Sequence, residues 1–92
     1  MNIVADMSLY PLKNAPVPDI IEFIHALRAQ PGLEVVSNQL STQVSGSFEA
    51  VTAAVNHCMR QAMERPETVV LVVRYLNIER ELDRAPTLTP DA

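Results

Sequence analysis

The stretch VVLVVRYLNI, from Val69 to Ile78, is the most apolar part of the chain and decides how the rest is interpreted. Its first five residues are all branched and aliphatic, so both faces of an extended strand would be apolar. Such a strand is expected at the centre of a sheet that is covered on both sides, because otherwise several valines would face water. We therefore predict a central strand over Val69–Ile78 and a partner that covers one face of its sheet.

Five further elements are expected upstream of this strand. Alternating apolar residues predict the first strand, and apolar residues spaced three or four apart predict two helices. Pro31-Gly32 and Gly46-Ser47 separate these elements from two short strands joined by a turn, and Ser47 is the expected N-cap of the second helix. In chain order the predicted elements are a strand over 2–10, a helix over 19–30, strands over 33–40 and 41–45, and a helix over 48–65.

The order strand–helix–strand–strand–helix–strand predicts an α+β fold of the ferredoxin-like βαββαβ type. Right-handed crossovers then give a four-stranded antiparallel sheet with two helices on one face, and the first and third strands are neighbours. Residues 1–82 would form one ligand-binding domain, and residues 83–92 a polar tail. Because the helix-free face needs a cover, we expect a homodimer or a tetramer, and we expect Leu88 of the tail to contact another subunit or a lattice neighbour.

Length, charge and composition exclude several classes of protein. The chain has 92 residues, of which 48% are hydrophobic and 20% charged, so one globular domain is expected. A net charge of −4, with no basic stripe, argues against nucleic-acid partners. No apolar run is long enough for a membrane span, and the first residues do not resemble a signal peptide. These features predict a cytoplasmic location and no membrane partner.

Catalytic patterns are weak in this sequence. His25 and His57 have no residues at ligand spacing beside them, and Cys58 lies on the apolar stripe of the second helix, where a thiol behaves as a small hydrophobe. Gly32 and Gly46 are the only glycines, so a glycine-rich phosphate loop is absent from the sequence. We therefore expect no enzymatic activity, no cofactor and no metal site.

Polar residues within the strands are the candidates for binding. Asp6, Ser8 and Tyr10 share one face of the first strand, and Asn38, Ser41 and Thr42 lie where the second strand turns into the third. Because the first and third strands are predicted neighbours, these groups could converge at one end of the sheet. An unsatisfied buried polar group costs about 1–3 kcal/mol, so they must bond a ligand, one another, nearby backbone groups or water.

Three stretches together resemble the YkoF-like thiamine-binding family. They are Ser8-Leu9-Tyr10-Pro11-Leu12, the segment from Leu40 to Gly46, and the valine-rich last strand. The resemblance implies a ferredoxin-like domain that binds thiamine or its hydroxymethylpyrimidine moiety without covalent chemistry. The better-known pattern has two such domains in one chain, so a homodimer would have to rebuild that pair here.

The ligand-binding residues that the resemblance implies are Ser8, Tyr10, Ser41 and Thr42. Asp6 and Asn38 are added because of their strand face and neighbourhood. Hydroxyl and amide groups would bind the aminopyrimidine, whereas a carboxylate and an aromatic face would suit the thiazolium cation.

Two other classes of protein stay open at this level. One is an oligomerising interaction module without a small ligand, in which Ser8 and Thr42 would be structural. The other is an enzyme of the dimeric ferredoxin-like type, which is disfavoured because His25, His57 and Arg74 are poorly placed for a cleft between sheet and helices.

Overall fold

The chain folds into one sheet and two helices, and the computed structural model describes residues 1–78, 82–86 and 88–89. The expected tail over 83–92 therefore lies partly outside the described residues. The six elements follow the predicted order: β1 (Asn2–Pro11), α1 (Val17–Arg28), β2 (Glu34–Ser37), β3 (Thr42–Ser47), α2 (Phe48–Met63) and β4 (Val69–Leu76).

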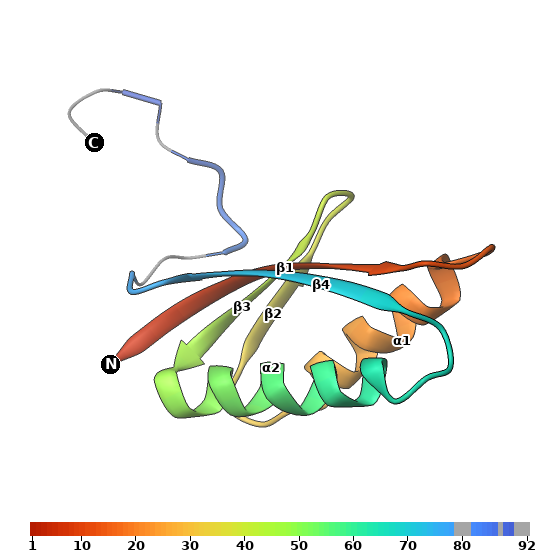
Figure 1. Ribbon diagram of the computed structural model, residues 1–92. Helices are drawn as coiled ribbons and strands as arrows, with labels where there is room; N and C mark the ends of the chain where they lie inside the picture. Colours follow the sequence, from red (N-terminus) through yellow and green to blue (C-terminus); the bar gives the residue numbers. More distant parts are fainter. Residues whose placement is uncertain (79–81, 87, 90–92) are drawn as a thin grey trace.

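The sheet has the order β2-β3-β1-β4, and all its neighbouring strands are antiparallel. Both helices lie on one face of this sheet (Figure 1). The ferredoxin-like βαββαβ fold is thereby confirmed, as is the predicted pairing of β1 with β3. Asp6 pairs with Gln43 of β3 on one side and with Arg74 of β4 on the other, so the centre of β1 is also the centre of the sheet.

The predicted central position of the last strand is wrong, because β4 is an edge strand. The second crossover returns the chain to the free side of β1, and among the described residues no strand follows to cover β4. Its residues alternate between half-buried and exposed, with Val70 43% and Val72 49% exposed. The two-sided apolar pattern thus reflects a face packed on the helices and an apolar face that no helix covers, rather than two covered faces.

The core lies between the sheet and the helices. Alternate residues of β1, namely Ile3, Ala5, Met7 and Leu9, are buried against the helix layer. From the helices, the buried side chains recur at helical spacing and face the sheet: Phe23, Leu27, Val51, Val55 and Cys58. This arrangement leaves the other face of the sheet without a helix.

The ends of the elements follow local chemistry. Ser47 caps α2 as predicted, with its hydroxyl accepting a hydrogen bond from Ala50 N at 3.1 Å. The first helix begins two residues earlier than expected, at Val17, because Pro18 fits the first turn, where no intrahelical donor is needed. Asp19 joins Lys13 at 3.0 Å and Arg65 at 2.9 Å, which ties the loop before α1 to the end of α2.

Within the described part of the chain, no helix is both long and apolar enough to span a membrane.

Candidate functional site

The helix-free side of the sheet, here called the open face, combines apolar and polar side chains. From β1 this face carries Asp6, Ser8 and Tyr10 together with Val4, which is buried, and these four residues alternate with the core residues. The strand register places partners from β3 and β4 beside them on this face: Ser45, Gln43, Leu76, Arg74, Val72 and Val70. The polar residues concentrate at the middle of the face, with valine and leucine on either side.

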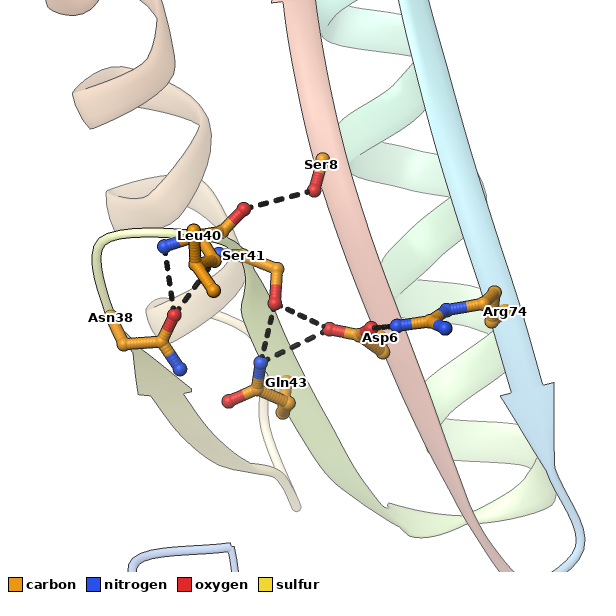
Figure 2. A network of polar contacts seen from close by, with 7 residues as sticks. All are labelled: Asp6, Ser8, Asn38, Leu40, Ser41, Gln43 and Arg74. Carbon is orange, nitrogen blue, oxygen red and sulfur yellow. Dashed lines mark hydrogen bonds and ion pairs between the residues drawn. The ribbon is translucent and has the colours of Figure 1, made fainter.

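A hydrogen-bonded network surrounds Asp6 at this centre (Figure 2). The Asp6 Oδ1 atom accepts hydrogen bonds from Ser41 Oγ at 2.7 Å and from Gln43 Nε2 at 3.0 Å. Gln43 Nε2 also donates to Ser41 Oγ at 2.6 Å. On the other side, Arg74 forms an ion pair with Asp6 Oδ2, so strands β3, β1 and β4 are joined through one carboxylate.

The network keeps Asp6 ionised. Partial burial acts to raise the pKa of this carboxyl, but hydrogen bonds from Ser41, Gln43 and Arg74, with the charge of Arg74, outweigh it and hold the pKa below its ordinary value of 3.8. Asp6 itself is only 15% exposed, whereas the Arg74 side chain is 76% exposed. The pair is therefore locally neutral, with a guanidinium that remains accessible to a ligand.

Acid should weaken the fold through this carboxylate. Because the pKa of Asp6 is lower in the folded than in the unfolded chain, its contribution is complete above the unfolded value and is lost as pH falls through the folded value. We expect the difference in unfolding free energy between wild type and Asp6→Asn to shrink from about pH 5 to about pH 3. Urea denaturation across this range measures it.

The matched control is Glu34→Gln. Glu34 is exposed at the same face and makes no side-chain hydrogen bond within the described residues. Its variant should follow the wild-type pH dependence. A wild-type to Asp6→Asn difference that stays constant with pH would contradict the assignment of the lowered pKa to this network.

Three predicted site residues lie together at the β2–β3 turn and the adjacent part of β1. Ser41 bonds Asp6 directly, and Ser8 Oγ donates to the Leu40 carbonyl oxygen at 3.3 Å (Figure 2). Asn38 does not reach Asp6. Its Oδ1 instead accepts hydrogen bonds from Leu40 N at 2.9 Å and from Ser41 N at 3.1 Å. These two bonds hold the turn that places Ser41 beside Asp6.

Thr42 and Tyr10 do not join this cluster. Thr42 pairs with Met7 and is buried on the helix side of the sheet, where its hydroxyl hydrogen-bonds Ser37 at 2.8 Å. It was predicted beside Ser41, but adjacent residues of a strand point to opposite faces. Tyr10 does lie on the open face, about 13 Å along β1 from Asp6 at the rise of a strand, and its ring is 52% exposed.

Sequence reasoning missed two members of the network, Gln43 and Arg74. A signal for Arg74 was present, because Asp6 is the only charged residue of β1 and Arg74 is the only one of β4. These strands are neighbours in the ferredoxin-like topology, so pairing the two charges gives the observed register. Gln43 is two residues after Ser41, and residues two apart in a strand point to the same face of the sheet.

The open face offers hydrogen-bonding groups that the network leaves available. Gln43 Oε1 makes no hydrogen bond to any described residue and can accept one, and Arg74 carries further N–H donors beyond the one that contacts Asp6. Val72 and Leu76 provide an apolar surface next to these groups. Together these groups can bind a flat, polar-edged ring lying against the sheet.

Metal binding and thiol chemistry have no comparable site. Within the residues that the structure describes, no cluster of three or more His, Cys, Asp or Glu side chains could hold a metal ion. Cys58 is buried under the sheet, and burial raises the pKa of its thiol, which disfavours the reactive thiolate.

Comparison with known proteins identifies the fold of this chain but not its family. The sequence matches no known protein family and no curated protein. Among solved structures, protein SP2199 from Streptococcus pneumoniae aligns with a TM-score of 0.77 at 19% identity, covering 90% of this chain and 92% of that one. The hypothetical protein MJ1052 from Methanocaldococcus jannaschii aligns with a TM-score of 0.72 at 20% identity, covering 95% and 88%.

A third similar structure carries a functional description. TM0486 from Thermotoga maritima, a candidate thiamine biosynthesis/salvage protein, aligns with a TM-score of 0.71 at 17% identity, and the alignment covers 82% of each chain. At these identities the likeness shows the common ferredoxin-like fold.

Proposed function

We propose that this protein is a non-catalytic binding protein for thiamine or its hydroxymethylpyrimidine moiety. The observation that carries the proposal is the Asp6 network, which lies at the middle of an apolar sheet face. The resemblance of Ser8 to Leu12 and Leu40 to Gly46 to the YkoF-like family supports the choice of ligand. A structural neighbour described as a candidate thiamine biosynthesis/salvage protein is consistent with it.

The chemistry of the pyrimidine suits the open face. An aminopyrimidine presents an amino donor next to ring-nitrogen acceptors. Gln43 Oε1 can accept from the amino group, and Arg74 can donate to a ring nitrogen. The ring itself would lie beside Arg74 on either Val72 or Leu76, which are 49% and 43% exposed. No group on this face is arranged to break or form a covalent bond, so binding and release are the proposed activity.

A second copy of the chain is the proposed cover for this ligand. An open sheet face leaves one side of a bound ring in water, whereas small-molecule sites bury most of their ligand. We therefore retain the homodimer or tetramer, with the open face in the interface and Leu88, which is 88% exposed in the single chain, against another subunit. Sedimentation at tens of micromolar protein should show a species of at least 20 kDa, about twice the 10.2 kDa chain. A 10 kDa species alone would contradict this assembly.

Calorimetric titration with thiamine and with hydroxymethylpyrimidine tests the proposed ligand. Two substitutions by valine sharpen the test, because each removes one hydroxyl group and the two hydroxyls lie on opposite faces of the sheet. Ser8→Val, on the open face, should weaken binding by about 1 kcal/mol, or roughly fivefold. Thr42→Val should leave binding unchanged, since its hydroxyl bonds Ser37 on the helix side. Equal effects of the two variants would move the ligand away from the open face.

The competing function is an interaction module whose open face serves only to bind protein. The observation in its favour is the exposed apolar row of Val70, Val72 and Leu76 on β4. It predicts the same oligomer without any ligand. No heat and no thermal shift with either compound at millimolar concentration would support the interaction module and overturn the binding protein.

A further inference from the structure

A hollow of about 480 Å³ is lined by the start of β1, the end of β4 and the start of α2. These three segments lie at the same end of the molecule (Figure 1). Its lining comes from these three segments: Met1, Ile3, Phe48, Thr52, Asn56, Tyr75, Leu76 and Asn77. It is here called the end pocket. None of its residues belongs to the Asp6 network, although Leu76 also borders the proposed open-face site.

The end pocket lies between the end of β4, the start of β1 and one flank of α2. The buried stripe of α2 packs under the sheet, whereas Phe48, Thr52 and Asn56 recur every fourth residue along the flank of this helix. On β4, Val73 packs against the core, but Tyr75, the next residue on the same face, is 49% exposed. The end of β4 and the flank of α2 therefore line the same hollow.

Two aromatic rings face this hollow with much of their surface in water. Phe48 is 44% exposed and Tyr75 is 49% exposed, although the chain has only four aromatic residues. Neither ring belongs to the buried core, for which Phe23 is the aromatic member. Covering the two rings with another flat ring would bury apolar area and add a favourable aromatic contact. The pair therefore points to an aromatic occupant.

The polar groups of the end pocket indicate the net charge of that occupant and the hydrogen-bonding groups on the edge of its ring. Among the described residues that line the end pocket, no side chain is acidic or basic. Asn56 and Asn77 make no side-chain hydrogen bond to any described residue, and each offers two N–H donors and one carbonyl acceptor. An uncharged ligand loses no ionic hydration here, and its amide or amino edge can bond both carboxamides.

We propose that the end pocket binds an uncharged, planar heteroaromatic molecule of one or two rings. The rings lie between Phe48 and Tyr75, and an amide- or amino-bearing edge bonds Asn56 and Asn77. The volume lies within the 300–1,000 Å³ range of small-molecule pockets. This site goes beyond the proposed thiamine-type site on the open face and does not depend on it.

A charge series of one ring tests the proposal directly. Nicotinamide is uncharged, nicotinate carries a negative charge, and 1-methylnicotinamide carries a positive charge. In amide-detected NMR titrations of the full chain, nicotinamide should shift the signals of Phe48, Asn56 and Tyr75 with a dissociation constant in the millimolar range expected for so small a molecule. The two ions should bind at least tenfold more weakly. Equal binding of all three, or shifts at Asp6 and Gln43 instead, would overturn the proposal.

Variants that fill or strip the end pocket provide the second test. Thr52→Trp should fill the end pocket and weaken nicotinamide binding at least tenfold. Tyr75→Ala removes one aromatic wall of the pocket and should also weaken nicotinamide binding at least tenfold. The second variant serves as the test if the first folds poorly. The control is Met63→Trp, at the last residue of the same helix, which is 50% exposed and lies outside the pocket. Wild-type nicotinamide binding by both pocket variants would overturn the proposal.

Two readouts separate this site from the other proposals. Thiamine, whose positive charge excludes it from the end pocket, should bind Thr52→Trp as it binds wild type, so failure of the end pocket and failure of the open-face site can be told apart. Sedimentation of Thr52→Trp should give the wild-type mass. A drop in mass would show that a second copy of the chain occupies the end pocket, and would overturn the small-molecule assignment.

Discussion

Replacing Gly46 by alanine should lower the free energy of unfolding by about 2–3 kcal/mol, the usual cost of forcing atoms into a packed site. A Cβ atom at this position would lie 2.7 Å from the Gly32 carbonyl oxygen and 3.2 Å from Leu33 Cδ2. The obstructing oxygen belongs to the backbone, so β3 or the Gly32 turn must shift. Urea denaturation measures the loss, which is a large part of the roughly 5–14 kcal/mol expected for a chain of this size.

Gly32→Ala is the matched control for this prediction. Gly32 has φ +75°, which strains an L-residue, but its added Cβ would meet only Ala50 Cβ at an ordinary 3.7 Å. We expect a loss of about 1 kcal/mol, from the backbone conformation alone. If Gly46→Ala costs no more than Gly32→Ala, the close approach between β3 and the Gly32 turn does not constrain the fold.

This contact also explains why the strand boundary near Gly46 could not be predicted. Glycine usually interrupts a strand, so Gly46-Ser47 was interpreted as the end of a strand at Ser45. In the structure β3 continues to Ser47, and Gly46 pairs with Ile3. The residue is small because another part of the backbone passes beside it, which depends on tertiary packing that a local pattern does not contain.

The order of the elements was predictable because each carries its own periodicity, but the position of β4 was not. Val69 to Val73 are apolar on both faces, and composition alone does not distinguish a covered face from one left open for a partner. The βαββαβ order itself contained the answer, since its crossovers place the last strand beside β1 at an edge. In this chain topology was a better guide to that strand than hydrophobicity.

The candidate site was predictable in its strands and only partly in its residues. Asp6 and Ser41 meet because β1 and β3 are neighbours, as the topology requires. Thr42 was wrongly grouped with Ser41 because the start of β3, and hence the face of each residue, was not fixed by the sequence. Arg74 was overlooked as a binding residue because it was considered only for an enzyme cleft and not as the counter-ion of Asp6.

The ion pair between Asp6 and Arg74 should decide how the open face discriminates between its proposed ligands. Both contain the same pyrimidine, but only thiamine carries a permanent positive charge. In wild type Arg74 neutralises Asp6, so the thiazolium meets no net attraction. We expect Asp6→Asn to weaken thiamine binding about thirtyfold, or about 2 kcal/mol, because Arg74 is left without its counter-ion and repels the cation. Hydroxymethylpyrimidine should lose much less.

Arg74→Gln should have the opposite effect on the same ligand. It leaves the Asp6 carboxylate without a counter-charge but also removes the Arg74 hydrogen bond to the pyrimidine, so thiamine should bind up to about tenfold more tightly, whereas hydroxymethylpyrimidine should bind about fivefold more weakly. Arg60→Gln is the matched control, because it removes the same charge from an exposed position on α2, on the other side of the sheet. Calorimetric titration of both ligands measures these differences. Parallel changes for thiamine and hydroxymethylpyrimidine in both variants would show that the thiazolium does not approach Asp6, and would place the ligand elsewhere on the open face.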